Sequence, residues 1–404
     1  MKLHIGIAGP ISTESISRYI EGDVSSLPTG YVGAPFLGTL IGELLARGHQ
    51  VSAFTTSPNL PLNFRQAFVA HGERFKIYYC PVRKHSLRMN GWHLGRIIDF
   101  FRLERRYLVQ AIHLDNPDIV HAHWAYEFAL AAIASGKPHL VTCHDAPQKI
   151  LKFMPNLYRL GRYFMALKTM RAAQKLTTVS PYMRNLLQPL ARKDIELIPN
   201  PIPAMIAHHT FDRLRKLKLT APIVMMVTNG WSKHKNSQAG LIAFAKLRAT
   251  HVGARLRLFG SDFGQGEIGQ RWAQEQGIAD GMEFVGTLPY EMLLKEIAQS
   301  DVFLHPSLEE SFGMVVAEAM ALGVPVVGGM KSGAVPWVIG NGGILVDVTN
   351  PVEISGALKK VLDSQERWQQ LREAAHQSAL TRFAPEVVAE LYEKSYQIHL
   401  SQIA

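Results

Sequence analysis

The chain has 404 residues, of which 47% are hydrophobic and 19% are charged. This length exceeds what one hydrophobic core usually supports, so we expect two domains, and the composition excludes bulk disorder. We find no run of the roughly 18 apolar residues that a membrane-spanning helix needs, and the opening run Met1–Gly9 is too short and too quickly interrupted to predict a signal peptide.

The formal net charge of +10 is unevenly distributed. Residues 1–200 hold 24 Lys and Arg against 13 Asp and Glu, whereas the remainder holds 19 against 20. A basic half beside a neutral half predicts that an anionic surface or acceptor binds on one side. The two cysteines, Cys80 and Cys143, have neither metal-site spacing nor a disulfide pattern, which favours a reducing cytoplasm.

Short apolar runs alternate with longer helical patterns along the first half, which predicts parallel sheets with crossover helices. The strands expected there are Leu3–Ala8, Val51–Thr55, Lys76–Cys80, Ile119–Ala122, Leu140–Cys143, Leu176–Val179 and Glu196–Ile198. The helices expected there are 34–47, 92–115, 124–135, 152–174 and 182–190.

Three prolines within Pro199–Pro203 break every regular element, so we expect the domain boundary there. A second alternation follows, with strands expected at Ile223–Thr228, Arg255–Phe259, Met282–Val285, Val302–Leu304, Val324–Val327 and Gly343–Val346. Its expected helices are 236–249, 268–277, 290–299, 312–322 and 352–378, and a last helix follows Pro385. The predicted domains are therefore 1–203 and 204–384, both α/β and Rossmann-like. Ligands of such sheets bind beyond the carboxyl ends of the strands.

The most informative motif begins at Glu310 and ends at Glu318. Its setting predicts a strand, a loop, a helix and a tight Gly turn, with Ser311 as N-cap and Gly313 leaving the first helical turn open. Amide groups at such a helix start bind anions. Two carboxylates beside an anion site suit a nucleotide diphosphate joined to a polyol. The alternative is an amphipathic helix with two solvated glutamates.

This run resembles the E-x7-E signature of family 4 retaining glycosyltransferases, and nearly the whole chain agrees with that resemblance. The resemblance implies the GT-B fold, in which two Rossmann-like domains face each other across a cleft and the C-terminal helix, 385–404, crosses back to the first domain. It implies that the first domain binds the acceptor and the second binds the nucleotide sugar. It also implies that Glu310 holds a donor-sugar hydroxyl, that Glu318 binds the ribose, and that amides of Ser311, Phe312 and Gly313 hold the diphosphate.

Two features of the first half fit this family. A loop with Gly30 and Gly33 precedes a helix, so its amides can approach a phosphate, although a plain turn has the same pattern. His144 follows a buried strand, where the resemblance implies a catalytic role close to the donor sugar and phosphate. The alternative is a structural histidine. The pattern His121-Ala-His123 has no third ligand at suitable spacing, so we interpret it as lining or core and expect no metal site.

In the second half, Lys235 matches the family lysine that clamps the donor diphosphate. The family's arginine position holds Trp231, and Lys233 is a candidate replacement, although an ammonium cannot copy a bidentate guanidinium. A Glu often follows the Pro of the Gly-rich loop 328–336, but Trp337 stands here and receives no inherited role.

The resemblance thus implies a metal-independent retaining hexosyltransferase, and we expect no cofactor. It uses a nucleotide diphosphate sugar and a glycan or lipid-linked acceptor, in the cytoplasm, for cell-surface polysaccharide or lipopolysaccharide synthesis. Alternatives are a sugar-nucleotide epimerase of the same fold and a degenerate nucleotide-sugar-binding protein. Two basic stretches with aromatic residues, Arg83–Arg102 and Lys149–Lys175, suit peripheral contact with an anionic membrane or a crossover helix with one solvated face. No nucleic-acid-binding motif accompanies them, so we expect no nucleic acid.

Overall fold

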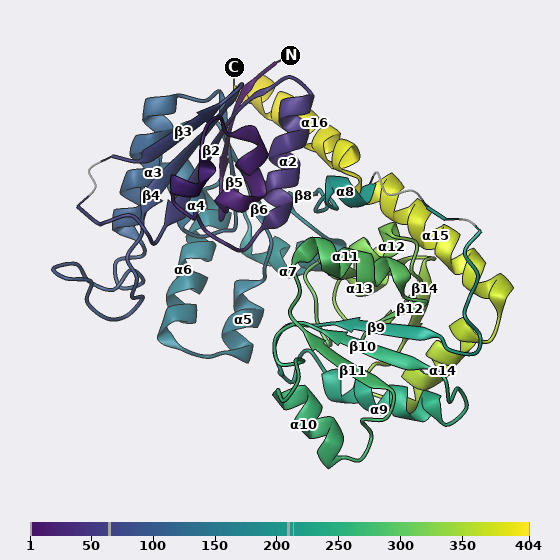
Figure 1. Cartoon of the computed structure of the whole chain (residues 1–404). Helices are drawn as coiled ribbons and strands as arrows, with labels where there is room; N and C mark the ends of the chain where they lie inside the picture. The colour runs from purple at the N-terminus through teal and green to yellow at the C-terminus, as the bar shows by residue number, and fades with distance from the viewer. Residues whose placement is uncertain (1, 64–65, 208–210, 213, 404) are drawn as a thin grey trace. The chain divides into compact units, whose positions relative to one another are not determined.

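The computed structural model describes residues 2–63, 66–207, 211–212 and 214–403. The chain divides into two compact units (Figure 1): Met1–Pro201 with Pro385–Ala404, here the N-terminal unit, and Ile202–Ala384, here the C-terminal unit. The sequence had predicted one boundary after residue 203 and another at residue 385.

The N-terminal unit is built on an eight-stranded sheet with the order β3-β4-β2-β1-β5-β6-β7-β8. Its neighbours pair in parallel, except that β3 pairs antiparallel with β4. The central strands are buried on both faces, as expected where crossover helices cover a parallel sheet. The strands are β1 His4–Ala8, β2 Gln50–Ser57, β3 Phe68–Gly72, β4 Phe75–Pro81, β5 Ile119–His123, β6 His139–Cys143, β7 Lys175–Thr178 and β8 Ile195–Leu197.

The last helix of the chain belongs to the N-terminal unit. In α16, the Glu393 carboxylate accepts from Arg47 Nε at 2.7 Å and lies 2.5 Å from His49 Nε2, while Tyr396 Oη is 2.7 Å from His121 Nδ1. The expected return of this helix to the first domain is therefore confirmed. The helices of the unit are α1 Thr13–Ile16, α2 Pro35–Ala46, α3 Arg102–Asp115, α4 Glu127–Ala134, α5 Pro147–Phe153, α6 Leu157–Ala172, α7 Pro181–Leu187 and α16 Pro385–Ile403.

The C-terminal unit is built on a six-stranded parallel sheet with the order β11-β10-β9-β12-β13-β14. Its strands are β9 Ile223–Val227, β10 Arg255–Phe259, β11 Met282–Gly286, β12 Val302–His305, β13 Val326–Gly329 and β14 Gly343–Val346. The strand order reverses between β9 and β12, and in such sheets ligands bind at the carboxyl ends of the strands on either side of this point.

Helices cover both faces of this second sheet (Figure 1), with α9 and α14 on one side and α11, α12 and α13 on the other. Trp368 of α15 is fully buried, and its indole donates to Asp301 O at 2.7 Å, which anchors α15 to the base of β12. The helices are α8 Ala204–Ala207, α9 Ser237–Arg248, α10 Ile268–Glu275, α11 Tyr290–Gln299, α12 Met314–Ala321, α13 Val335–Ile339, α14 Pro351–Leu362 and α15 Gln365–Phe383.

Three predicted helices differ from the structure. The one expected at 92–115 begins only at Arg102, because the preceding residues form a hydrogen-bonded loop that ends in two left-handed residues, Phe100 and Phe101. The helix expected at 152–174 is divided between α5 and α6, where the Asn156 side chain caps α6. The helix expected at 352–378 is likewise divided, with Ser364 capping α15. Strand β3 was not predicted.

Candidate active site

Two residues proposed for catalysis meet at the switch point of the C-terminal sheet. Lys235 lies in the loop after β9, and Glu310 lies in the loop after β12. These two strands are neighbours, so their loops emerge at one edge. Lys235 Nζ is 2.8 Å from Glu310 Oε1.

The same carboxylate oxygen has two further polar neighbours. Ser307 Oγ donates to Glu310 Oε1 at 2.9 Å, and His305 Nε2 lies 3.5 Å from it. Burial alone would raise the pKa of Glu310, but His305 and Lys235 outweigh burial and hold this pKa well below its usual range. Glu310 is therefore a carboxylate at every physiological pH.

The position of Lys235 is fixed by hydrogen bonds to the backbone of neighbouring loops. The next residue, Asn236, has left-handed dihedral angles (φ 52°), and its side-chain amide donates to Pro306 O at 3.0 Å and to Val348 O, after β14, at 2.8 Å. The backbone amide of Leu308 also donates to His234 O at 2.7 Å. The ammonium and the carboxylate are thus held together before any ligand binds.

The helix after this loop starts later than the sequence predicted. α12 begins at Met314, and Gly313 is its N-cap residue, with φ +93° and ψ 61°. The prediction of Ser311 as N-cap is wrong, because a left-handed residue is needed where the loop enters the helix and glycine adopts that conformation at little cost. The first turn of α12 therefore starts after Gly313, whose carbonyl accepts from the amides of Val316 and Ala317 at 3.0 and 3.2 Å.

Phe312 contributes its side chain to the core rather than to a ligand. Its buried ring packs at 6.2 Å from Trp337 and 5.2 Å from Phe383, with edge-to-face geometry. Trp337, to which the sequence assigned no role, also lies under the Arg382 guanidinium, 4.6 Å from the ring centroid. Only the backbone of Phe312 is left to contact a ligand.

Glu318 differs sharply from Glu310 in its surroundings. It is 6% exposed, and the Tyr290 hydroxyl donates to its Oε1 at 2.6 Å. Burial raises the pKa of Glu318 to about 7, and the Tyr290 hydrogen bond only partly opposes this shift. The two carboxyls of the motif thus differ in protonation near neutral pH.

The position at which the family has an arginine is apolar here. The Trp231 ring packs against Phe263 at 5.7 Å and Trp272 at 5.6 Å, and its backbone amide donates to Asp262 at 2.7 Å. Lys233 is exposed to solvent two residues later. Within the described part of the chain, Lys233 forms no ion pair with Glu310, and its replacement of the arginine stays a prediction.

In the N-terminal unit, His144 follows β6 and contacts the histidine that ends the neighbouring strand. His144 Nε2 is 2.9 Å from His123 Nδ1, at the end of β5. The rings of Phe36 and Trp124 pack against His144 at 5.1 Å and 4.4 Å. Burial lowers the pKa of His144 to about 3 and lowers that of His123 as well. Both imidazoles are therefore neutral.

This arrangement fixes which nitrogen of His144 can act. If Nε2 accepts from His123, the neutral His144 ring carries its proton on Nδ1. Nδ1 is buried and has no hydrogen-bond partner among the described residues. A buried polar nitrogen without a partner is rare and indicates a group kept for a ligand or a water.

The glycine loop is partly structural. Gly30 has φ +70°, and a Cβ there would lie 2.4 Å from Ile11 O, so this glycine is required by its packing on the segment after β1. Gly33 is exposed and borders a cavity of about 320 Å³. Direct contact of either glycine with a donor stays a prediction.

That cavity lies at the switch point of the N-terminal sheet. Trp124 and Tyr31 are among its walls, and an ion pair, Arg162 to Glu127 at 3.4 Å, is part of its lining. The Arg162 guanidinium also lies 3.5 Å above the Tyr126 ring. Aromatic surface beside a few convergent polar groups is typical of a small-molecule site.

Sequence reasoning missed three contacting residues. His305 and Ser307 touch Glu310, and His123 orients His144, whereas His123 had been interpreted as lining or core. Their common signal is a polar residue at or just after the carboxyl end of a central strand. Within the described residues, no group of three His, Cys, Asp or Glu could hold a metal ion, and no helix there is long and apolar enough to cross a membrane.

Two protein-family models match consecutive parts of the chain. The model described as Glycosyltransferase Family 4 matches residues 35–204, and the one described as Glycosyl transferases group 1 matches residues 211–378. The chain belongs to glycosyltransferase family 4. This glycosyltransferase therefore uses a nucleotide-sugar donor, and the prediction of a glycosyltransferase is confirmed.

Curated relatives carry several different acceptor names. The N-acetyl-alpha-D-glucosaminyl L-malate synthase of Bacillus anthracis is 27% identical over 379 residues, covering 90% of this chain and 93% of that protein. The glycogen synthase of Mycobacterium tuberculosis is 27% identical over 290 residues, covering 70% and 69%. These relatives support the class of reaction but do not agree on an acceptor.

Solved structures confirm the GT-B fold of two Rossmann-like α/β domains. Sucrose-phosphate synthase from Thermosynechococcus elongatus superposes with a TM-score of 0.73 at 18% identity, covering 99% of this chain and all of that one. Anabaena HepE in complex with UDP and glucose gives a TM-score of 0.68 at 15% identity, covering 98% and 100%. At these identities the likeness concerns the fold alone.

Proposed function

We propose that this glycosyltransferase moves a hexose from a nucleotide diphosphate sugar to a hydroxyl of a glycan or lipid-linked acceptor, with retention and without a metal. The observation that carries the proposal is the preformed Lys235–Glu310 pair at the switch point of the C-terminal sheet. In this proposal the C-terminal unit binds the donor and the N-terminal unit binds the acceptor.

The leaving group is stabilised by fixed positive charge. Cleavage of the bond between the anomeric carbon and the phosphate oxygen leaves negative charge on the diphosphate. The Lys235 ammonium and the amides at the start of α12 are fixed donors for that charge and need no reorganisation during the reaction. Lys233 supplies a second, solvent-exposed cation. These groups take the charge-neutralising role that a divalent metal has in other transferases.

Glu310 acts on the sugar. Its carboxylate is ionised because its pKa is depressed. It can therefore accept a hydrogen bond from a hydroxyl of the donor sugar and stabilise the positive charge that develops on the sugar ring. When the diphosphate attracts Lys235, the ion pair weakens and Glu310 becomes a better acceptor. The ionised Glu318 carboxylate accepts hydrogen bonds from the ribose hydroxyls. Backbone amides of Ser311, Phe312 and Gly313 complete the proposed donor site.

His144 is proposed to donate its Nδ1 proton to a hydroxyl or phosphate oxygen of the donor. Being neutral, it adds no charge and needs no change of protonation at pH 7. Gly30 and Gly33 are proposed to border the donor through their backbone. The cavity beside Gly33, with Trp124 and the Arg162–Glu127 pair, suits a polyol acceptor because aromatic walls and paired polar groups orient a sugar ring.

The biological setting follows from the acceptor. We propose a role in cell-surface polysaccharide or lipopolysaccharide synthesis, in the cytoplasm, with peripheral contact to an anionic membrane and no nucleic-acid partner. The support is the basic N-terminal half, whose Lys and Arg exceed Asp and Glu by nearly two to one.

A nucleotide screen tests the donor site. We would measure thermal shifts and dissociation constants for UDP, GDP and ADP with wild type, Lys235→Ala and Lys246→Ala. Lys246 is an exposed lysine on α9 and serves as the matched control. We expect one nucleotide to bind, with affinity reduced about tenfold or more by Lys235→Ala, because charge-assisted contacts to phosphate are worth about 1.5–3 kcal/mol. Equal effects of both substitutions would contradict the assignment.

A turnover assay tests the reaction itself. The nucleotide sugar of the base found in the screen is incubated with and without candidate glycan acceptors, and nucleoside diphosphate release and the anomeric configuration are followed by NMR. Acceptor-dependent release with retention supports the proposal. An inverted product, or donor epimerisation without acceptor, would refute it.

A further inference from the structure

A loop of the N-terminal unit exposes an unusual number of large apolar side chains. Residues 84–101 connect β4 to α3, and their outward side chains include Leu87, Met89, Trp92, Leu94, Ile98 and Phe100. Trp92 is 100% exposed and Met89 is 54% exposed. Single exposed apolar residues are ordinary, but six on one connection form a patch that normally has a binding role.

The tip of this loop is a tight, hydrogen-bonded turn. The backbone groups of Asn90 and His93 exchange two hydrogen bonds of 2.8 and 3.2 Å, so Trp92 stands at the apex beside Gly91, whose φ is +62°. The Asn90 side chain binds both the amide and the carbonyl of His85 at 2.8 and 3.0 Å. The exposure of Trp92 is therefore held by local structure.

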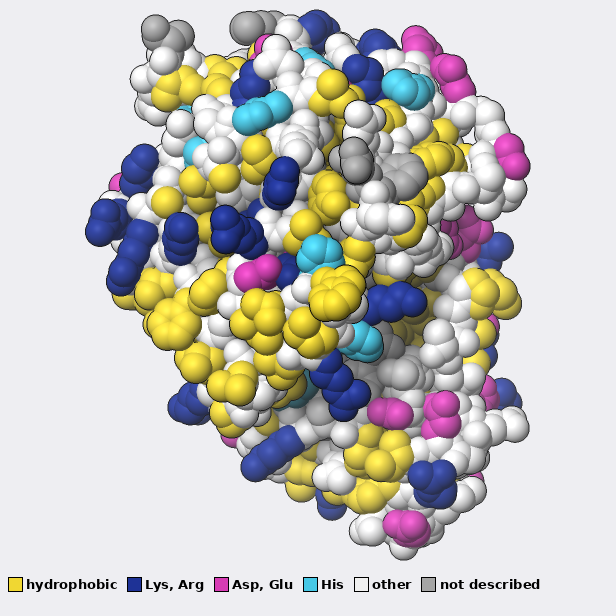
Figure 2. Space-filling view, turned by 90° about the vertical axis from the view of Figure 1, so that its left-hand side faces the viewer, with side chains coloured by type: hydrophobic (Ala, Val, Ile, Leu, Met, Phe, Trp, Pro, Cys, Tyr) yellow, Lys and Arg dark blue, Asp and Glu magenta, His cyan; other side chains and the backbone are white. Residues whose placement is uncertain are grey.

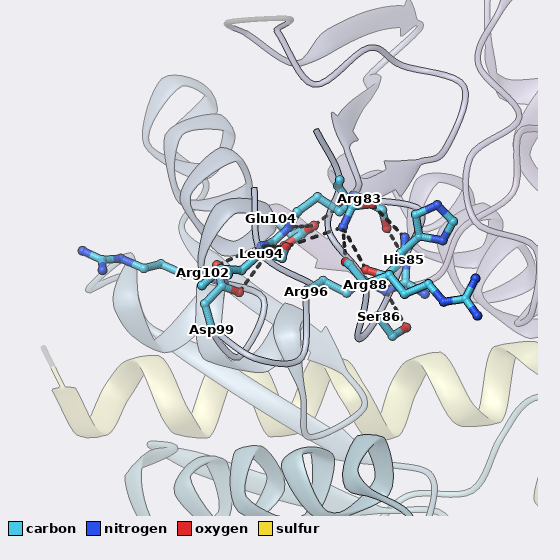
Figure 3. Close-up of polar contacts among 10 residues, drawn as sticks. Arg83, His85, Ser86, Arg88, Leu94, Arg96, Asp99, Arg102 and Glu104 are labelled. Carbon is cyan, nitrogen blue, oxygen red and sulfur yellow. Dashed lines mark hydrogen bonds and ion pairs between the residues drawn. The ribbon is translucent and has the colours of Figure 1, made fainter. Parts of the chain in front are cut away.

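A buried arginine fixes the base of the loop (Figure 3). Arg83 is 1% exposed, and its guanidinium donates to Glu104 at 2.9 and 2.6 Å, to both oxygens of Asp99 at 2.8 Å and to Leu94 O at 2.9 Å. Arg96 returns a bond to Arg83 O at 2.8 Å. A guanidinium that bridges the start, middle and end of one loop preorganises it, so ligand binding would cost little ordering entropy.

A second exposed apolar segment adjoins this loop. A Cβ on Gly161 of α6 would lie 2.6 Å from the Ile97 side chain of the loop, so this side chain packs directly on α6. Exposed on α5, α6 and their connection are Phe153, Met154, Leu157, Leu160 and Phe164. We call the exposed side chains of residues 84–102 and 149–171 together the docking face.

Positive charge surrounds these apolar groups. Of the five Lys and Arg in residues 83–102, Lys84, Arg88 and Arg102 are exposed, and the single acidic residue, Asp99, is paired with the buried Arg83. Residues 147–172 hold six Lys and Arg and no acidic residue, and one of the six, Arg162, is paired with Glu127 of α4. Figure 2 faces the side of the molecule on which the loop lies, and it shows hydrophobic side chains bordered by Lys and Arg.

We propose that the docking face binds the surface of an anionic lipid bilayer, with Trp92 and its apolar neighbours inserted at the headgroup level. Tryptophan prefers the membrane interface, and each basic residue beside an anionic surface adds attraction. A protein interface core would be depleted of charge, and nucleic acid would leave six apolar side chains without a role. The proposal specifies the surface behind the proposed membrane contact, and it is tested without donor or acceptor.

The experiment is co-sedimentation with vesicles of phosphatidylglycerol and phosphatidylcholine, or of phosphatidylcholine alone, at low and high salt. We expect binding only to anionic vesicles, weakened by salt because the charges are exposed. Trp92→Glu should lower the partition coefficient about tenfold or more, and Arg88→Glu about fivefold or more. Val352→Glu, at an apolar site on α14 that is 61% exposed, is the matched control and should bind as wild type.

A second measurement guards against misfolding. Trp92→Phe should retain binding. The fluorescence of Trp92 is the wild-type signal minus the signal of this variant, and brominated lipids should quench it. Thermal melts should be unchanged for all variants, because Trp92 and Arg88 are exposed. Equal binding of wild type and Trp92→Glu, absence of quenching, or no preference for anionic vesicles would overturn the proposal. So would dimerisation in free solution that Trp92→Glu abolishes, since it would assign the face to a second copy of the chain.

Discussion

Replacing Glu310 with glutamine separates the chemistry of the pair from its contribution to folding. The substitution keeps the size of the side chain and removes its charge. The amide oxygen can still accept from Lys235 and Ser307, which lie 2.8 and 2.9 Å from the present carboxylate oxygen. We therefore expect Glu310→Gln to fold.

The expected loss of stability is small. The Lys235 side chain is 24% exposed, so its ammonium can turn towards water when its partner becomes neutral. Partly exposed ion pairs contribute about 1 kcal/mol or less, and we expect a destabilisation of about 1 kcal/mol.

The expected loss of activity is much larger. The carboxylate faces positive charge that exists only in the transition state, and removing one such preorganised electrostatic group costs about 10²–10³ in kcat, or about 2.7–4 kcal/mol. Urea unfolding and initial rates of nucleoside diphosphate release measure the two quantities on one preparation. Glu275→Gln, the same substitution at an exposed position of α10, is the control. The reasoning fails if Glu310→Gln retains near-normal kcat, or if its activity falls only in proportion to the folded fraction.

Three further predictions concern buried polar groups. Burial raises the pKa of Glu318 from 4.5 to about 7, so folding favours its protonated form. The contribution of this group to the free energy of unfolding is complete below pH 4.5 and is lost as the pH rises to about 7. It amounts to about 3 kcal/mol. Glu318→Gln should therefore flatten the pH dependence of urea unfolding over this window, while nucleotide affinity of wild type should rise as pH passes 7. Arg83→Met should lower the free energy of unfolding by about 3–5 kcal/mol, because it leaves Glu104 charged and 0% exposed without its partner. The double variant, Arg83→Met with Glu104→Gln, should recover much of that loss in urea unfolding. His123→Phe should lower kcat about fivefold, the value of one neutral hydrogen bond to His144, with little change in melting temperature.

Each of these three has its own adverse result. An unchanged pH slope in Glu318→Gln would mean that this carboxyl is ionised in the fold. Strict additivity of the two substitutions at Arg83 and Glu104 would contradict their coupling. Nitrogen NMR that finds the His144 proton on Nε2 in wild type would exclude the proposed tautomer.

Local patterns predicted much of the fold. The buried strands of both sheets are continuous apolar runs, so their positions were evident, as was the proline-rich break near Pro199. The carboxyl ends of β9 and β12 hold Lys235 and Glu310, and the strand pattern alone indicated that such residues meet at one sheet edge. The antiparallel strand β3 was not predicted, because it lies at the sheet edge and lacks a continuous apolar run.

Interactions between distant residues were not predicted from sequence patterns. The helix expected from residue 92 is a loop, because Arg83 binds groups at Leu94, Asp99 and Glu104 and a helix could not present all three to one guanidinium. Likewise, the sequence could not predict that the pKa of Glu310 is lowered and that of Glu318 is raised, because these shifts depend on burial and on residues brought close by folding.

Apolar periodicity and local motifs were enough to predict the family, the two α/β domains and most candidate site residues. The tertiary structure alone decided that Gly313 rather than Ser311 starts α12, that His123 orients His144, and that loop 84–101 holds Trp92 in solvent. Each of these depends on hydrogen bonds or dihedral angles set by contacts between segments, and such contacts leave no local periodicity in the chain.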